Sequence, residues 1–382
     1  MSLTGWLFPD SVAVLTVAAF VAAVIWWPQL AGRGRSRIVA RIGMLLGINL
    51  LVLLTAAIQL NAQFLFFADW TDLAGAFGGT STSTALTRGT SASKAANHTV
   101  TGSAATPAAT LPPLPPQGVS ATGIITYSVT GPLSGITGTI VVQLPPGYTD
   151  SGQASVRYPV LETFQGYPGT PREWVDTMAL GTVMADTVTA RRMRPALIVS
   201  PQMEIPAGVD TECVNGGPGH AQVETWLAQD VPNWVARTFR VQTTRTAWAS
   251  IGLSAGGWCA AMVAMLHPAQ YSAAIIMAGY FAPEFGPLYD PYPAGSALAA
   301  RYDLVALAKR APPPVALWVQ TSHSDPVSYT SSAALLKAAK PPLAISATVL
   351  QHAGHRMSLW EGLTPSTLVW LGSNIPGFAW TP

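Results

Sequence analysis

The sequence predicts an α/β protein with a mainly parallel, eight-stranded sheet, helices on both faces of the sheet, and two transmembrane helices in front of it. Two observations support this fold class. Uncharged apolar stretches occupy much of the first 70 residues, and short β-rich runs alternate with helical runs from Ala121 onward. Such alternation is typical of parallel sheets with helical crossovers. We therefore expect a membrane anchor at 1–70, a linker at 71–120 and a folded domain at 121–382.

The composition points to a folded protein that is partly in lipid. Charged residues make up 10% of the chain and hydrophobic residues 49%, which differs from the profile of a disordered protein. The formal net charge is only +2, and the second half has no basic stripe with interleaved aromatic residues. Nucleic acid is therefore not an expected partner.

Two stretches are long enough to cross a membrane. Residues 11–32 and 42–68 contain no charged side chain, and 12–27 and 44–60 are their most apolar parts. The alternative is a cleaved signal peptide followed by a buried core helix. The first stretch, however, has no basic start and no cleavage site of the A-x-A type.

The charges around these stretches predict their orientation. Four arginines lie between them, whereas the flanking segments carry acidic residues: Arg33, Arg35, Arg37 and Arg41 against Asp10, Asp69 and Asp72. Basic loops favour the cytoplasmic side. We therefore expect a cell-membrane protein whose folded domain lies on the extracytoplasmic face.

The next segment has the composition of a linker. Residues 75–117 are rich in Ser, Thr, Ala and Gly and end in a proline-rich run. Such a segment buries too little apolar surface to offset its ordering entropy. As a flexible coil of about 40 residues it would reach roughly 35 Å.

The remaining two thirds contain the eight expected strands. They lie at 124–129, 139–144, 158–164, 196–202, 247–252, 273–278, 315–320 and 345–350. Helical spacing of apolar residues occurs between them, for example at 223–239 and 331–339.

A candidate nucleophile follows the fifth expected strand. Gly252-Leu253-Ser254-Ala255-Gly256 matches G-x-S-x-G, with a β-rich run before it and a helical run after it. This strand–turn–helix context is that of the nucleophile elbow in the α/β-hydrolase fold. The alternative is a glycine-rich turn with an incidental serine.

A serine nucleophile needs a histidine base and an orienting carboxylate, which this fold supplies in the order Ser, Asp or Glu, His. His352 and His355 both follow the last expected strand, and we favour His355 because it lies on the loop that leads into a helix. Asp325 follows the seventh strand, where the fold presents its acid. The weaker candidates for the acid are Asp290 and Asp303.

The tetrahedral intermediate also needs two backbone N–H donors. One comes from the residue after the nucleophile and the other from the loop after the third strand. These positions correspond to Ala255 and Tyr167, which we expect to form the oxyanion hole.

Over about residues 122–376 the chain resembles the esterase D and antigen 85 mycolyltransferase group of α/β-hydrolases. The residues that match are 144–148 (LPPGY), the strand that begins at Tyr158, 252–257 (GLSAGG), and Gly354-His355 with Trp360. The resemblance implies ester hydrolysis or acyl transfer by a metal-free triad without a cofactor, and it places His355 in the histidine position. Gln165 and Met357 depart from the usual pattern of the group.

The chain contains two cysteines, Cys213 after the fourth strand and Cys259 on the elbow helix. In an exported domain an even cysteine count favours a disulfide between them. The alternative is two unrelated buried thiols.

The sequence therefore predicts a serine esterase, membrane-integrated, that acts on an ester or lipid-like acyl substrate. Two alternatives stay open: a mycolyltransferase-like acyltransferase that uses a sugar or envelope glycan, and a non-catalytic envelope protein. No protein partner is indicated.

Overall fold

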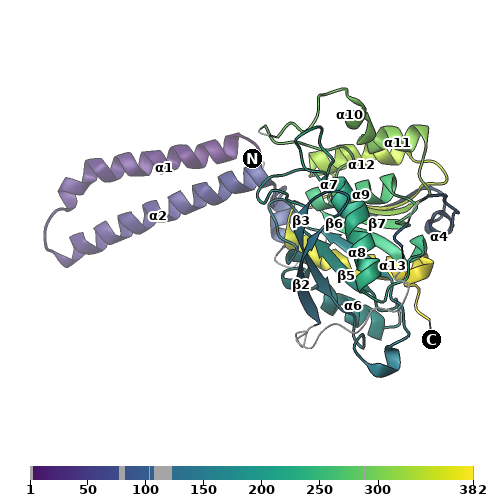
Figure 1. Cartoon of the computed structure of the whole chain (residues 1–382). Helices are drawn as coiled ribbons and strands as arrows, with labels where there is room; N and C mark the ends of the chain where they lie inside the picture. The colour runs from purple at the N-terminus through teal and green to yellow at the C-terminus, as the bar shows by residue number, and fades with distance from the viewer. Residues whose placement is uncertain (1–2, 77–81, 103, 107–122, 288, 382) are drawn as a thin grey trace. The chain divides into compact units, whose positions relative to one another are not determined.

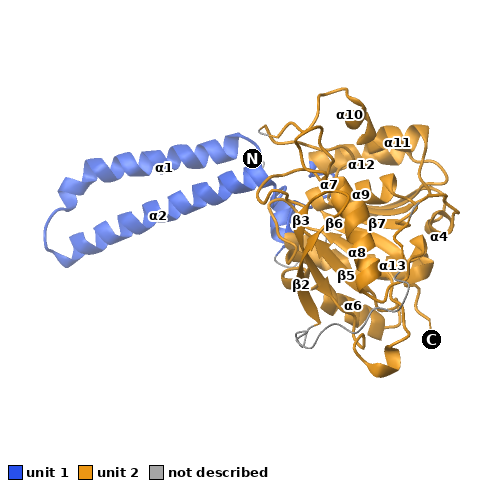
Figure 2. Cartoon of the chain, viewed as in Figure 1, with its two compact units in different colours: residues 1–82, 322–325, 351–356 blue, residues 83–321, 326–350, 357–382 orange. Residues whose placement is uncertain are grey.

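The computed structural model describes residues 3–76, 82–102, 104–106, 123–287 and 289–381. The chain forms two compact units, shown in Figure 2. Unit 1 contains residues 1–82 and two short loops, 322–325 and 351–356. Unit 2 contains residues 83–321, 326–350 and 357–382.

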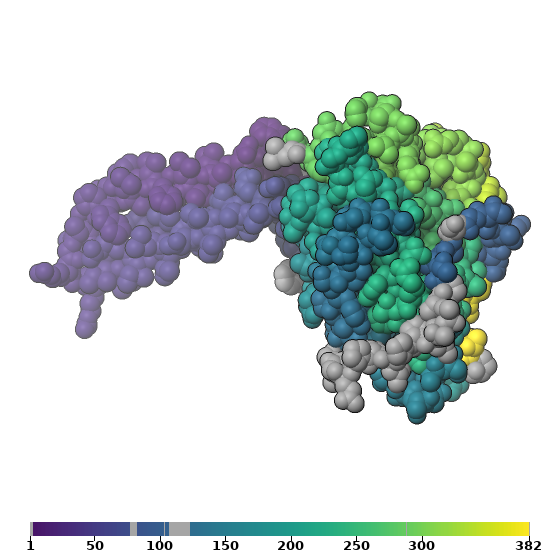
Figure 3. All heavy atoms as spheres, viewed as in Figure 1, coloured from purple at the N-terminus to yellow at the C-terminus, as the bar shows by residue number. Residues whose placement is uncertain are grey.

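Unit 1 is built on a helical hairpin (Figure 1). Its elements are α1 (Leu7–Trp26), η1 (Trp27–Leu30), α2 (Arg35–Phe64) and α3 (Trp70–Gly75). The hydroxyl groups of Thr16 and Thr55 join α1 and α2 by a hydrogen bond of 2.8 Å. Both helices are long and apolar enough to cross a membrane, and they lie side by side in Figure 3. They overlap the two stretches that the sequence predicts as spans, since the candidate spans of the structure are Leu7–Leu30 and Arg35–Phe64.

Unit 2 contains a nine-stranded sheet of order β1-β9-β8-β7-β6-β4-β5-β3-β2. The strands are β1 (Ser83–Gly89), β2 (Ile124–Thr130), β3 (Thr137–Gln143), β4 (Val160–Phe164), β5 (Leu197–Pro201), β6 (Trp248–Leu253), β7 (Ala273–Met277), β8 (Ala316–Ser322), which ends at the boundary with unit 1, and β9 (Ala344–Leu350). Strands β5, β4, β6, β7 and β8 are parallel neighbours, whereas β2–β3, β3–β5 and β1–β9 are antiparallel pairs. The predicted α/β fold and its eight strands are confirmed.

The ninth strand, β1, comes from the segment that we expected to be an unstructured linker. Its seven residues pair with β9 from Ser83 opposite Leu350 to Gly89 opposite Ala344. Helix α4 (Ala92–Ala96) follows, and its alanines pack into the core. An edge strand that is mostly exposed needs no alternating apolar pattern, because its backbone hydrogen bonds to β9 hold it. Residues 107–120 of the expected linker lie outside the described residues.

Helices cover both faces of the sheet. Alternate strand residues contribute to two separate hydrophobic clusters, as Val160 and Leu161 do on β4. One cluster includes α8 (Val231–Thr238), α9 (Ala255–Leu266), α11 (Leu304–Arg310) and α12 (Pro326–Ala338). The other includes α6 (Leu180–Thr189) and α13 (Met357–Asn374). The remaining elements are η2 (Ser151–Gln153), α5 (Glu173–Asp176), α7 (Val223–Thr225), the π-helix η3 (Trp226–Asp230), η4 (Arg245–Ala247), α10 (Ala297–Arg301) and η5 (Pro376–Phe378).

Candidate active site

Ser254 occupies a one-residue turn between β6 and α9. Its backbone has φ 55° and ψ −126°, a combination that non-glycine residues rarely adopt. The Ser254 amide donates to the Met277 carbonyl over 2.9 Å, which ties the turn to the end of β7. This is the sharp strand-to-helix turn that the motif predicts.

The two motif glycines are required by close backbone approaches. A Cβ on Gly252 would lie 1.9 Å from the Gly256 carbonyl oxygen. A Cβ on Gly256 would lie 2.2 Å from the Phe164 carbonyl oxygen, at the end of β4. Both distances are impossible for a side chain, so the elbow forms only with glycine at these positions.

The loop after β4 lies beside Ser254. A Cβ on Gly166 would be 3.7 Å from the Ser254 Cβ. The next residue, Tyr167, is 42% exposed, and its hydroxyl group donates to the Gly208 carbonyl over 3.2 Å. Ala255, the other expected oxyanion donor, is the first residue of α9 and is buried. Unit 2 therefore brings three of the predicted site residues, Ser254, Ala255 and Tyr167, into one region.

Two glutamates that the sequence analysis did not identify shape this loop. Glu173 accepts a hydrogen bond of 3.0 Å from the Gly166 amide, and Glu204 accepts one of 2.7 Å from the Gly169 amide. Burial raises the pKa of Glu173 above its ordinary value, although the Gly166 hydrogen bond opposes this effect. Neither glutamate belongs to a motif, so the sequence contained no signal for this role.

His355 and Asp325 form a pair within unit 1. Nδ1 of His355 lies 3.0 Å from Oδ2 of Asp325, whose side chain is 7% exposed. Ser322 joins their loops, because its hydroxyl oxygen accepts from the Ala353 amide (3.2 Å) and its carbonyl oxygen from the Asp325 amide (3.0 Å). The predicted base and acid are thus brought together.

The competing candidates have other partners. Nδ1 of His352 lies 2.7 Å from Oδ2 of Asp69, and the His352 side chain is 51% exposed. Asp303 caps α11 by accepting a hydrogen bond of 2.7 Å from the Ala306 amide. Asp290 is exposed, in the segment between β7 and α10.

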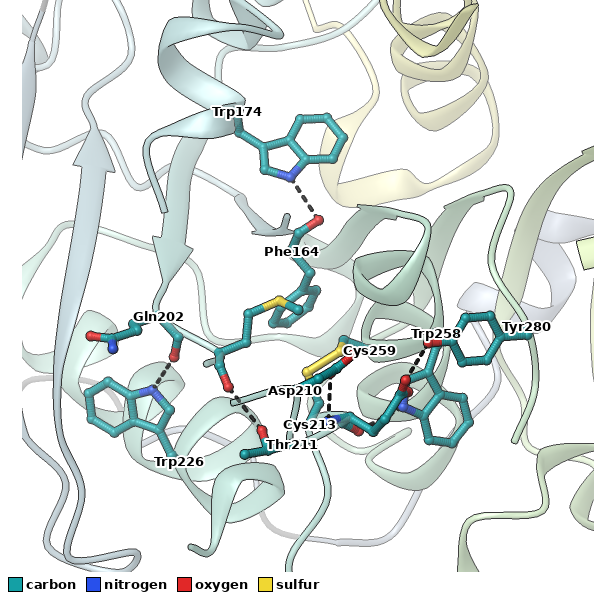
Figure 4. The surroundings of a disulfide bond; sticks show 12 residues. Phe164, Trp174, Gln202, Asp210, Thr211, Cys213, Trp226, Trp258, Cys259 and Tyr280 are labelled. Carbon is teal, nitrogen blue, oxygen red and sulfur yellow. Dashed lines mark hydrogen bonds between the residues drawn. A yellow bond between two sulfur atoms is a disulfide. The ribbon is translucent and has the colours of Figure 1, made fainter. Parts of the chain in front are cut away.

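Cys213 and Cys259 form a disulfide, as the sequence analysis predicts, with their Cα atoms 5.7 Å apart. Figure 4 shows the bond beside Trp258, whose indole N–H donates to the Glu212 carbonyl over 2.7 Å. Burial, then the nearby Asp210, raises the pKa of Glu212 well above its ordinary value. The loop after β5 is therefore fixed to the helix that follows Ser254.

Within the described residues, no group of three or more His, Cys, Asp or Glu side chains is arranged to hold a metal ion. Unit 2 contributes the Ser254 hydroxyl and backbone amides, and unit 1 contributes an imidazole–carboxylate pair. These groups are suited to nucleophilic acyl transfer.

Known proteins show similarity to this chain at the level of family and fold. The Esterase family model matches residues 135–357. An uncharacterized protein of Corynebacterium glutamicum is 27% identical over 143 residues, which are 37% of this chain and 33% of that protein. The chain thus spans about a third of the curated relative that it matches.

Solved structures share the fold at low sequence identity. A ferulic acid esterase has a TM-score of 0.53 and 18% identity, over 65% of this chain and 96% of its own. The S-formylglutathione hydrolase from Agrobacterium tumefaciens has a TM-score of 0.54 and 16% identity, over 67% and 97%. A fluorophosphonate-binding serine hydrolase from Staphylococcus aureus has a TM-score of 0.50 and 14% identity, over 65% and 97%. Since the family model covers more than half of the 382 residues, the chain belongs to the Esterase family.

Proposed function

We propose that this protein is a membrane-tethered serine esterase that hydrolyses carboxylic esters through an acyl-enzyme outside the cytoplasm. The observation that carries the proposal is the backbone of Ser254, held at φ 55° directly before α9. A strained serine at the start of a helix is the arrangement in which a hydroxyl nucleophile is presented to substrate.

In this proposal Ser254 attacks the ester carbonyl while His355 accepts its proton. Asp325 holds the imidazole through Nδ1, and the proposal assigns the proton transfer to Nε2. His355 then gives the proton to the leaving alcohol, and water releases the acyl group by the same steps. Two features support the assignment: the chain order Ser, Asp, His, and the parallel strands β6, β7 and β8, of which β6 precedes Ser254 and β8 precedes Asp325.

The proposal assigns the oxyanion hole to the amides of Ala255 and Tyr167. Ala255 is the first residue of α9, where the amides have no partner within the helix and the helix dipole favours negative charge. The adjoining Gly166 amide is already used by Glu173, which favours the next amide in the loop for the substrate.

Membrane tethering is supported by the surfaces of α1 and α2. Large apolar side chains on both helices are exposed, for example Val24 at 73% and Leu50 at 67%, a surface that suits lipid rather than water. The four arginines between the two apolar stretches favour the cytoplasm, and the disulfide suits an oxidising compartment. Both features favour an extracytoplasmic position for unit 2.

A fluorophosphonate probe tests the chemistry directly. We expect wild type to be labelled at Ser254, and Ser254→Ala and His355→Ala to lose labelling. His352→Ala is the matched control on the same loop, and it should keep most of the labelling rate because its pair with Asp69 is exposed. The proposal fails if wild type is unlabelled or if Ser254→Ala is labelled equally.

A fusion of alkaline phosphatase to the carboxyl terminus tests the location. The phosphatase folds only where its disulfides form, so activity in intact cells is expected. An inactive fusion, together with a fluorescent cytoplasmic fusion at the same site, would place unit 2 inside the cell.

A further inference from the structure

The segment after α2, residues 65–72, contacts the loop that carries His355. We call it the juxtamembrane segment, and we infer that it positions the imidazole for catalysis, so that the end of the second helix is part of the active site. The inference rests on the proposed function, because it assumes that His355 is the base.

The juxtamembrane segment holds the backbone on which the imidazole sits. The His355 amide donates to the Leu65 carbonyl over 2.7 Å. The preceding amide, that of Gly354, donates to the Asp72 carboxylate over 2.7 Å. Two consecutive amides are therefore fixed by residues that lie more than 280 positions earlier in the chain.

Asp72 is the centre of these contacts. Its side chain is 1% exposed and forms an ion pair of 2.7 Å with Nη1 of Arg356. It also accepts a hydrogen bond of 3.0 Å from the Ala68 amide. Removing one partner of a buried ion pair leaves an uncompensated charge. Loss of Asp72 should therefore disturb both neighbours of His355, Gly354 and Arg356.

Arg356 contacts other residues of the juxtamembrane segment besides Asp72. Its Nη1 also donates to the Phe66 carbonyl over 3.2 Å, and its guanidinium lies 5.0 Å from the centre of the Phe67 ring. The residue that follows His355 thus contacts three residues of the juxtamembrane segment.

Gly354 allows the close approach of the two chains. A Cβ at this position would lie 2.2 Å from the Phe66 carbonyl oxygen and 2.5 Å from the Leu65 carbonyl oxygen. Any other residue would push the loop away from the segment. The close approach of the juxtamembrane segment therefore explains why a glycine precedes the proposed base.

The segment is itself fixed to α2 rather than joined to it flexibly. Leu65 ends the helix in the left-handed conformation, with φ 54°. The Asn61 side chain accepts from the Phe67 amide (2.7 Å) and donates to the Phe67 carbonyl (2.9 Å). The backbone of His355 is therefore held in a fixed position relative to the last turn of α2.

Two roles for these contacts give different results. If they only stabilise the fold, their loss lowers the melting temperature, and kcat per labelled active site stays unchanged. If they position the imidazole, kcat per active site falls while KM changes little. A displacement of about 1 Å at a catalytic group can cost on the order of 100-fold in rate.

The experiment uses the full chain in lipid vesicles and a soluble short-chain ester, with kcat expressed per site titrated by the fluorophosphonate. We expect Asp72→Ala to lower kcat by about 100-fold with KM within about 2-fold. Asp72→Asn keeps an oxygen acceptor for Gly354 and should recover about 10-fold of that loss. The control is Asp176→Asn, which removes an exposed pair with Arg172 in unit 2 and should leave kcat unchanged.

Hydrogen exchange of the Gly354 and His355 amides in the same samples gives a readout that does not need activity. Exchange should be faster in Asp72→Ala than in wild type and unchanged in Asp176→Asn. Full kcat in Asp72→Ala, or unaltered exchange, would overturn the positioning role. An unlabelled Ser254 in wild type would instead refute the proposed function, so the two failures are distinguishable.

Discussion

Oδ2 of Asp325 lies 3.0 Å from Nδ1 of His355, although 30 residues separate them. The contact is possible because each residue lies on a short loop after a strand, β8 for Asp325 and β9 for His355. A carboxylate in this place selects the imidazole tautomer that carries the proton on Nδ1.

Asp325→Asn should abolish most activity while the protein stays folded. An amide has nearly the same shape but does not stabilise the imidazolium or select its tautomer, so we expect kcat to fall by about 10³- to 10⁴-fold. The measurement is hydrolysis of a short-chain ester. Asp303→Asn is the control, because that residue caps α11 and should affect only stability. Equal losses in both variants would contradict the assignment of the acid.

Gly256→Ala should disrupt the elbow. The added Cβ would meet the Phe164 carbonyl oxygen at 2.2 Å, and backbone cannot move away as a flexible side chain can. We expect a loss of about 3 kcal/mol of unfolding free energy or more, together with loss of probe labelling. Gly362→Ala in α13 is the matched helical control, because nothing lies within 4 Å of its added Cβ. That variant should be as stable as wild type or slightly more stable.

Buried strands and the elbow could be predicted from the sequence because their physical requirements are local. The strand Ala273–Met277 is buried at every position, which appears in the sequence as a short, continuous apolar run. Gly252 marks a close backbone approach to Gly256 within a single turn, and the motif spacing identifies Gly256 although its Cβ would meet Phe164 on β4. The disulfide was also predictable, since only two cysteines were available.

The contacts of β1 and Asp72 could not be predicted because partners distant in the sequence determine them. Ser83–Gly89 has a linker-like composition and becomes a strand through its backbone ladder with β9. In the sequence Asp72 follows a candidate span, and it helped to predict only the orientation of that span in the membrane. Its partners, Gly354 and Arg356, are about 280 residues away, and no spacing rule connects them.

Removing the disulfide should lower stability without abolishing folding. The bond closes a loop across a separation of 46 residues, for which chain entropy predicts about 4 kcal/mol. We expect Cys213→Ala with Cys259→Ala to melt roughly 10 °C below wild type. Scanning calorimetry of the oxidised wild type and the double variant measures this difference. Reductant should lower the melting temperature of wild type to about the value of the variant, and it should leave the variant unchanged.

Glu162→Gln should stabilise the protein at alkaline pH. Glu162 lies fully buried on β4 and accepts a 2.5 Å hydrogen bond from the Tyr271 hydroxyl. Burial raises its pKa from 4.5 to about 8, although this hydrogen bond opposes the effect. Between these values the folded state keeps a proton that the unfolded state releases, so stability falls as pH rises, by up to about 5 kcal/mol in total. Glutamine removes this titration and still accepts from Tyr271.

Denaturant unfolding at pH 5 and pH 8 checks this prediction, with Glu224→Gln as a control of opposite sign. Burial alone would raise the pKa of Glu224, but hydrogen bonds from His267, Arg301 and Tyr302 outweigh it and lower the pKa to about 2. Its contribution is therefore present above pH 4.5 and is lost as pH falls toward 2. Glu162→Gln should gain stability relative to wild type from pH 5 to pH 8, whereas Glu224→Gln should be less stable at both. An equal pH slope in wild type and Glu162→Gln would show that Glu162 is already ionised in the folded protein.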